Sequence, residues 1–416
     1  MALFTTLARM WLTRSWRPFQ FRNEYDQVLP YDECKKMGLY VHIPFCRTLC
    51  DFCPYCKVPY ESERANRYVE NLLQEIRLVC TNHPKREVTS LYFGGGTPAL
   101  LYQRLEEIIQ ELRRYFVITE GIGVELHPSD VTIPVLQELR CAGVTKLSIG
   151  IQSFQKKYQT LLGRSSVDYS AISAALTKVP FETVSFDFIF ALPGQTISDL
   201  ICDVDLAFQL GANHVALYPF IDFSFTKSDV QAMKNPDKRK LLNEITAYLK
   251  KNGCTRTSIW TFSNEKEACY SSMTRENFLG FGCSATTLLN GQFKINTFSP
   301  EAYGNRISHG RLPTSLTLKF SKRQRMVYYL FWTAYSTWVD PKEFQLFFGD
   351  KLSSWYGAEL WLAQRLGWLE KKDGKYHLTL NGVFAYHYFE SFYTLKYIDK
   401  MWNTLRENPF PSILRL

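Results

Sequence analysis

Residues 38–56 read Gly38-Leu-Tyr-Val-His-Ile-Pro-Phe-Cys46-Arg-Thr-Leu-Cys50-Asp-Phe-Cys53-Pro-Tyr-Cys56, an apolar run followed by four closely spaced cysteines. The run predicts a buried β-strand, and the first three cysteines follow it with the spacing C-x3-C-x2-C. Three thiolates so close together can hold three irons of an iron–sulfur cube and leave the fourth iron open. A structural zinc knuckle would need four ligands from two separated pairs, and no second pair with that spacing exists in the sequence. We therefore expect a strand that ends at a cluster-binding loop.

Five further β-rich runs follow this strand, at residues 90–93, 123–126, 146–151, 183–190 and 214–218. Between them, apolar residues recur at spacings of three and four over residues 61–80, 102–115, 133–142, 168–176 and 197–210. Strands that alternate with helices predict an α/β fold with a parallel sheet and right-handed crossovers, either open or curled into a partial barrel. In both arrangements the functional groups lie at the carboxyl ends of the strands.

Polar and glycine residues stand at those carboxyl ends. The second strand is followed by Gly94-Gly95-Gly96-Thr97-Pro98, the third carries Glu125, the fourth ends at Gln152 and the fifth holds Asp187. Each has a structural alternative, because a glycine segment can be a simple turn and a carboxylate in a strand can be a buried charge paired with a structural Arg or Lys. Their order at successive strand ends favours one shared site.

The pattern changes after residue 220. A helical stretch at residues 238–252 precedes a glycine-rich segment at 278–283 and a hairpin signal at Asn290-Gly291. Helical patterns and a small hairpin over Asp373-Gly374 then predict an α+β, winged-helix-like carboxyl-terminal domain. We expect an amino-terminal segment at 1–37, a barrel core at 38–235, a barrel-closing region at 236–318 and the small domain at 319–416.

The eleven cysteines are unevenly spread, which argues against a disulfide scaffold and favours a reduced, cytoplasmic setting. No apolar run is long enough to cross a membrane. Residues 1–19 combine tryptophans, leucines and arginines without an acidic residue, so they fit either a helix packed on the protein or an amphipathic helix at the inner membrane surface. The net charge of +9 is modest for a chain of this length and does not by itself indicate nucleic acid.

The cysteine spacing is that of the radical S-adenosylmethionine (SAM) superfamily, and the flanks narrow the resemblance. Five segments resemble the oxygen-independent coproporphyrinogen III oxidase family over residues of about 38–390, and they read YVHIPFC at 40–46, FGGGTP at 93–98, SIGIQSF at 148–154, LGR at 162–164 and DFIFALPGQ at 187–195. The resemblance implies a partial (β/α)6 barrel, with a 4Fe-4S cluster on Cys46, Cys50 and Cys53. It also implies SAM contacts at Tyr40, Gly94, Gly95, Gly96, Thr97, Glu125, Gln152, Arg164 and Asp187.

The family resemblance implies that SAM is cleaved reductively to a 5′-deoxyadenosyl radical, with an electron donor such as flavodoxin or ferredoxin. The radical would abstract hydrogen from a small-molecule substrate, a tetrapyrrole or another flat, apolar compound. Cys56 departs from the oxidase pattern, because Pro54 and Tyr55 separate it from Cys53 where the family has one residue. This departure weakens the assignment to coproporphyrinogen.

Two other branches of the family remain as alternatives. Residues 280–285 resemble the region close to a second SAM, which fits a two-SAM radical C-methyltransferase acting on an aromatic or quinone-like carbon. The haem-chaperone branch is not favoured, because its His-Asn-x-x-Tyr-Trp signature should precede Phe278 and residues 268–275 contain no histidine.

A different class of function would follow if the carboxyl-terminal domain belonged to a nucleic-acid-binding protein with a structural cluster. A recognition helix would need several basic residues, and residues 354–366 contain only Arg365, so no nucleic-acid partner is expected. Aromatic side chains crowd residues 386–402. They either pack as a helix that caps the barrel mouth or line the site of a flat, apolar substrate.

Overall fold

The computed structural model describes residues 2–23, 29–164, 167–228, 230–264 and 276–416. The six predicted strands are confirmed and pair in parallel, in chain order. They are β2 (Gly38–Ile43), β6 (Leu91–Gly95), β8 (Ile122–Leu126), β9 (Lys146–Gln152), β10 (Thr183–Phe190) and β11 (His214–Pro219). Most of their residues are buried, as expected for a parallel sheet whose faces are both covered.

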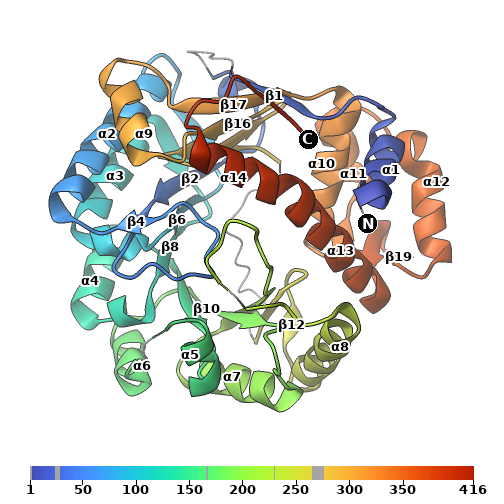
Figure 1. The fold of residues 1–416 in the computed structure, drawn as a ribbon, viewed down its shortest axis with the longest axis horizontal. Helices are drawn as coiled ribbons and strands as arrows, with labels where there is room; N and C mark the ends of the chain where they lie inside the picture. The colour runs from blue at the N-terminus through green and yellow to red at the C-terminus, as the bar shows by residue number, and fades with distance from the viewer. Residues whose placement is uncertain (1, 24–28, 165–166, 229, 265–275) are drawn as a thin grey trace.

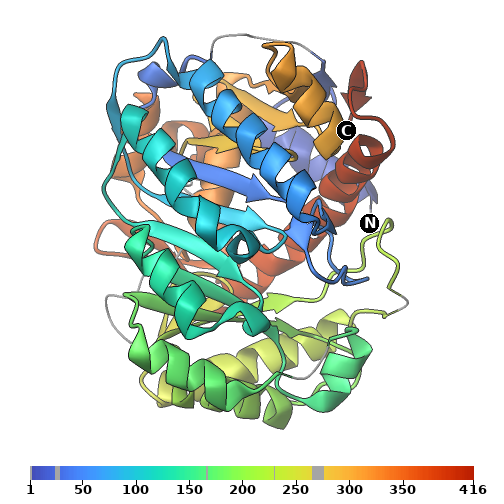
Figure 2. The ribbon, with the colours of Figure 1, turned by 90° about the vertical axis from the view of Figure 1, so that its left-hand side faces the viewer.

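The five predicted crossover helices are also present. They are α2 (Ser62–Cys80), α3 (Tyr102–Tyr115), α4 (Ile133–Cys141), α6 (Tyr169–Lys178) and α7 (Ile197–Gln209), and a short α5 (Lys156–Leu161) precedes α6. Figure 1 shows them in an arc outside the strands, and Figure 2 shows α2, α3 and α4 covering the outer face of the sheet. Because the six strands are parallel, their carboxyl ends lie at the same edge of the sheet. The cysteine loop follows the first of them, β2.

The sheet continues beyond the six strands at both edges. At one edge, β14 (Phe278–Phe281) pairs in parallel with β2 and leads to β15 (Thr286–Leu289), β16 (Gln292–Asn296) and β17 (Thr314–Lys319). The Asn290-Gly291 turn joins β15 and β16 as predicted. At the other edge, α8 (Asn235–Lys251) leads to β12 (Thr255–Arg256) and to β13 (Thr261–Ser263), which pairs with β11.

Both ends of the chain join the same sheet. β1 (Gln20–Arg22) pairs with β17 and with β21 (Ile413–Arg415). The division into four segments stays a prediction, and the sheet crosses its boundaries, because strands from the first and last segments extend the sheet of the core. α9 (Pro300–Ser308), between β16 and β17, packs against α2.

The carboxyl-terminal region has the predicted helices and small hairpin. α10 (Lys322–Ala334), α11 (Pro341–Phe348) and α12 (Leu352–Arg365) accompany a three-stranded sheet of β18 (Trp338–Val339), β20 (Lys375–Leu378) and β19 (Leu369–Lys372). Asp373 and Gly374 both have positive φ, as a tight hairpin turn requires. α13 (Leu380–Tyr393), a π-helical turn (Thr394–Ile398) and α14 (Asp399–Glu407) then return to the barrel.

The amino-terminal helix α1 (Ala2–Thr13) packs against α10 and α13. Arg323 Nε donates to the carbonyl oxygen of Leu12 at 2.9 Å, and Arg14 forms an ion pair with Glu359 at 2.9 Å. Trp11 and Trp16 nevertheless stay 58% and 85% exposed. The helix is therefore docked on the protein, and membrane contact through its outer side stays a prediction. Among the described residues, no helix has both the length and the apolar character needed to span a bilayer.

Candidate functional site

The three predicted cluster ligands lie on the loop between two short paired strands, β3 (Phe45–Cys46) and β4 (Val58–Pro59). Cys46, Cys50 and Cys53 are free thiols of intermediate exposure. Lys57 braces the loop by donating from Nζ to the carbonyl oxygens of Cys50 and Cys53. Thr97 Oγ1 donates to Cys46 Sγ at 3.8 Å, so the end of the second strand reaches the first thiol. The loop thus keeps three thiols without disulfides next to the glycine segment.

The glycine segment makes room for the protein's own side chains. Gly95 has φ +117°, and a Cβ there would lie 2.4 Å from the ring of His42. Its N–H donates to Glu125 Oε2 at 3.0 Å, and Tyr92 Oη donates to Glu125 Oε1 at 3.0 Å. A Cβ on Gly96 would lie 2.6 Å from the carbonyl oxygen of Phe45. The glycines are therefore required for close packing of β6 against the cluster loop, and their contact with SAM stays a prediction.

Glu125 and Asp187 face the same interior. Burial raises the pKa of Glu125, and burial together with the negative charge of Glu125 raises the pKa of Asp187 to about 7. Asp187 accepts hydrogen bonds from Ser148 Oγ and, at 3.1 Å, from Ser185 Oγ. Neither carboxyl forms an ion pair with any residue that the structure describes. Within the described ranges, neither carboxyl is therefore a charge paired with a structural Arg or Lys.

Two tyrosines border the same interior. Tyr40 is a predicted SAM contact on β2, and its Oη shares a hydrogen bond of 3.0 Å with His42 Nδ1. Burial, followed by the negative charge of Glu125, raises the pKa of Tyr40. Tyr55 lies on the cluster loop, and burial followed by the charge of Glu125 raises its pKa too. Its side chain is still 51% exposed.

Arg164 and Gln152 stand beside the loop and the strand ends. Arg164 lies over the ring of Phe52 at 5.9 Å, and its positive charge lowers the pKa of Cys50 against the larger, raising effect of burial. Its Nε is buried and has no hydrogen-bond partner among the residues that the structure describes. Gln152 ends β9 with φ +71°, which turns the chain away from the sheet after the strand. The structure therefore brings the predicted site residues from five strands and the cluster loop to one edge of the sheet.

Sequence patterns missed several side chains that complete the site. Tyr92 and the pair Ser148 and Ser185 hold the two carboxyls, and His214 Nδ1 lies 2.9 Å from Ser185 Oγ. The serines are polar residues within apolar strands, and that interruption is the signal that could have revealed them. Tyr55 carried no comparable signal, because a tyrosine in a loop is common.

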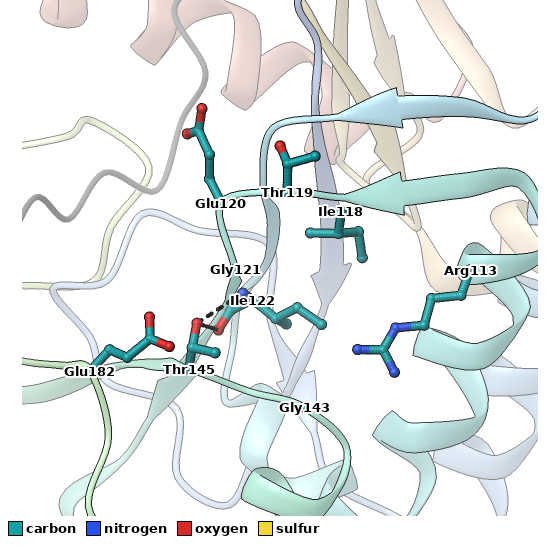
Figure 3. A pocket seen from close by; sticks show the side chains of 9 residues that line it. All are labelled: Arg113, Ile118, Thr119, Glu120, Gly121, Ile122, Gly143, Thr145 and Glu182. Carbon is teal, nitrogen blue, oxygen red and sulfur yellow. Dashed lines mark hydrogen bonds between the residues drawn. The ribbon is translucent and has the colours of Figure 1, made fainter.

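A separate pocket lies at the opposite edge of the sheet, near the amino ends of β8, β9 and β10 (Figure 3). Arg113, Glu120, Thr145 and Glu182 line it with several smaller residues. Thr145 Oγ1 accepts a hydrogen bond from the Ile122 N–H at 3.2 Å, which fixes the turn rather than a ligand. No predicted site residue lies in this pocket.

Asp187→Asn is expected to make the unfolding free energy less dependent on pH. The raised pKa means that the folded chain binds a proton that the unfolded chain has released, so wild-type stability falls as pH rises from about 4 to about 7. The full effect of such a shift would be about 4 kcal/mol, and water reaching the partly accessible carboxyl reduces it. Urea unfolding of the metal-free chains at pH 5 and pH 8 measures it. A variant that loses stability as steeply as the wild type would contradict this placement of Asp187.

Known proteins similar to this chain include heme chaperones and oxygen-independent coproporphyrinogen III oxidases. The model of the radical SAM superfamily matches residues 40–207. The chain is 28% identical over 272 residues to the heme chaperone HemW of Lactococcus lactis, covering 62% of this chain and 71% of that protein. It is 24% identical over 360 residues to HemW of Bacillus subtilis, covering 82% and 95%. It is 30% identical over 239 residues to the oxygen-independent coproporphyrinogen III oxidase of Escherichia coli, covering 54% and 52%.

The solved structure of coproporphyrinogen III oxidase (HemN) from Escherichia coli, described as a radical SAM enzyme, shares the fold. It aligns with a TM-score of 0.74 at 20% identity, covering 93% of this chain and 98% of that one. Residues 268–275, where the haem-chaperone signature is missing, lie outside the described residues. Residues 40–207, which match the radical SAM superfamily, contain the cysteine loop and the strands from β2 to β10, and the chain is similar in sequence to heme chaperones and to coproporphyrinogen III oxidases and similar in fold to HemN.

Proposed function

We propose that this chain holds a 4Fe-4S cluster on Cys46, Cys50 and Cys53, cleaves SAM reductively and abstracts hydrogen from a flat, apolar substrate of the tetrapyrrole class. The observation that carries the proposal is the position of Tyr55. It stands on the cluster loop, borders the interior that holds the two carboxyls, and lies 5.9 Å, between ring centroids, from Trp402 of α14. A substrate enclosed there would meet aromatic rings on one side and the cofactors on the other.

The residues present fit both cofactors. Three thiols on one short loop match the three-cysteine ligand set of a cluster with one open iron. Burial, followed by the neighbouring thiols of Cys53 and Cys50, raises the pKa of Cys46 to about 11, and a bound cation would favour its thiolate. The buried Nε of Arg164 has no partner within the described part of the chain, and a carboxylate such as that of SAM would satisfy it. Glu125 and Asp187 supply acceptors for an amino group or for ribose hydroxyls.

When bound, the cluster and SAM supply an electron and a 5′-deoxyadenosyl radical. The chain's own residues orient the ligands and exclude water. Lys57 fixes the loop by holding the carbonyls of Cys50 and Cys53, and Gly95 fixes Glu125 through its N–H. Tyr40 lies on β2 beside this interior, where its Oη and His42 Nδ1 share a hydrogen bond of 3.0 Å.

The names of the relatives support the substrate class. One set is named for oxidation of coproporphyrinogen III and the other for chaperoning heme, and both ligands are tetrapyrroles. Part of the aromatic-rich segment 386–402 packs into the core and does not line a substrate site, since Tyr386, Tyr397 and Met401 are buried. Residues 278–283 are buried too, and a Cβ on Gly280 would lie 2.1 Å from the carbonyl oxygen of Thr286. This segment has a packing role, which gives the two-SAM methyltransferase no support.

Product analysis tests the proposal. The reconstituted chain, reduced anaerobically with dithionite in place of a flavodoxin or ferredoxin, is incubated with SAM and coproporphyrinogen III or haem. We expect 5′-deoxyadenosine to form faster with a tetrapyrrole than without one, together with a change in the mass of that tetrapyrrole. Formation of S-adenosylhomocysteine with a gain of a methyl group would favour the methyltransferase instead. Tight haem binding without deoxyadenosine would favour a chaperone.

A further inference from the structure

A second group of metal-ligand side chains lies beneath the cluster loop. His42 comes from β2, Cys56 follows the three predicted cluster ligands, and Cys283 follows β14. One ligand atom from each lies within 4.8 Å of the other two. All three residues are buried, with exposed fractions of 3%, 4% and 0%. The proposed function uses none of these side chains.

The spacing of the two sulfur atoms suits a shared metal ion. Cys56 Sγ and Cys283 Sγ are 4.0 Å apart. Two Zn–S bonds of about 2.3 Å at a tetrahedral angle separate their sulfurs by about 3.8 Å, whereas a disulfide requires about 2.05 Å. The Cys56 thiol donates to the carbonyl oxygen of Phe298 at 3.1 Å, and this proton would leave when the thiolate binds a metal. Two thiolates would also neutralise a divalent cation, so the buried site would carry no net charge.

The surrounding residues hold these ligands in place. His42 Nδ1 lies 3.0 Å from Tyr40 Oη, and Nε2 faces the backbone carbonyl of Cys56 at 3.0 Å. Ligation of a metal replaces one of these two hydrogen bonds and keeps the other, which then orients the ring as is usual for a ligating histidine. Tyr68 Oη donates to the His42 carbonyl at 2.8 Å and accepts from the Cys283 N–H at 2.9 Å. The backbones of two ligands are thus joined through one phenol.

Cys56 contacts different residues from those that surround the cluster ligands Cys46, Cys50 and Cys53. Its sulfur contacts Cys283 and Phe298, and its backbone carbonyl contacts His42. Nearby, Glu75 is buried, accepts from the Gly282 N–H at 2.7 Å and fixes the turn that carries Cys283. The departure of Cys56 from the family spacing therefore coincides with a different set of neighbours.

We infer that His42, Cys56 and Cys283 bind one Zn²⁺ ion, with an oxygen ligand completing the tetrahedron. The ion ties the end of the cluster loop to β2 and β14, the two strands on which the loop rests. Sequence spacing could not reveal the site, because Cys283 lies 227 residues after Cys56 in the chain. It is separate from the cluster on Cys46, Cys50 and Cys53 and does not depend on the substrate.

Metal analysis of the anaerobically purified full chain, expressed with added Zn²⁺, tests the inference. We expect about one zinc per chain in addition to iron. Cys56→Ser and Cys283→Ser should each lower zinc about tenfold or more and keep iron, since loss of a direct ligand costs at least what loss of an outer-shell partner does. Cys50→Ala should lower iron and keep zinc. Cys254→Ser, which changes a buried thiol outside this group, is the matched control and should keep both metals.

A second measurement covers variants that fold poorly. Co²⁺ added to the otherwise unaltered Cys50→Ala chain should give the charge-transfer absorption of cobalt–thiolate bonds, because Co²⁺ accepts the same ligands as Zn²⁺. Three outcomes would overturn the inference. The first is a wild-type chain without zinc together with a Cys50→Ala chain without the cobalt absorption. The others are a zinc loss in Cys254→Ser equal to that in Cys56→Ser, and a Cys56–Cys283 disulfide in the anaerobic protein detected by mass spectrometry.

Discussion

The Cys50→Ala chain is expected to lose its iron–sulfur cluster and, with it, all measurable cleavage of SAM. Two remaining thiols, Cys46 and Cys53, leave one more iron of the cube without a protein ligand. Loss of an outer-shell partner alone typically costs a metal site about 10–100-fold, and loss of a direct ligand costs more. Iron and acid-labile sulfide per chain, and 5′-deoxyadenosine formed under dithionite, measure the effect.

Cys141→Ala is the matched control, because Cys141 is an exposed thiol on α4 outside the cluster loop. Its iron content and SAM cleavage should equal those of the wild type. If Cys50→Ala retained its iron and still formed deoxyadenosine, the cluster would be held elsewhere and the assignment of the loop would be wrong. Loss of the fold in Cys50→Ala would show in the circular dichroism of the metal-free chains, which should be the same for both variants.

The barrel strands were predictable because each is a short apolar run between an amphipathic helix and a turn. The same rule placed Glu125 and Asp187 at one edge, since carboxyl ends of parallel strands meet there. Neighbours on the sheet are also neighbours in the chain from β2 to β11, so local order was enough. The hydrogen-bond partners of the two carboxyls are seen only in the structure, because a periodic sequence pattern does not indicate which side chains meet.

Long-range pairing was not predictable in the same way. β14 lies beside β2 although about half of the chain separates them, and Gly280 permits the close approach of Thr286 behind it. β1 joins β17 and β21 for the same kind of non-local reason. Apolar patterns show which face of an element is buried but not which element covers it. The convergence of His42, Cys56 and Cys283 is a direct consequence of such a pairing.

The sequence left open whether the aromatic side chains of residues 386–402 pack as core or line the substrate site. Trp402→Ala should distinguish these two roles. Trp402 on α14 packs on the loop after β11 and on the cluster loop, with ring centroids 6.0 Å from Phe223 and 5.9 Å from Tyr55. Asp399 of the same helix accepts hydrogen bonds from the N–H and Oγ of Ser224, both at 2.6 Å. Arg406 donates to the carbonyl oxygen of Pro54. α14 therefore fastens two loops that border the site.

Removing the Trp402 ring should release the cluster loop without unfolding the barrel. A buried Trp→Ala change costs about 3–5 kcal/mol, and a half-buried ring should lie at the lower end of that range. If most of this energy holds the loop closed, iron should pass to a chelator about 100-fold faster, since about 1.4 kcal/mol corresponds to each factor of ten. Trp361→Ala is the control, because this ring on α12 is 62% exposed. Unchanged iron release from a destabilised Trp402→Ala chain would make the ring ordinary core, whereas faster release with deoxyadenosine formed independently of substrate would place it at the mouth of the site.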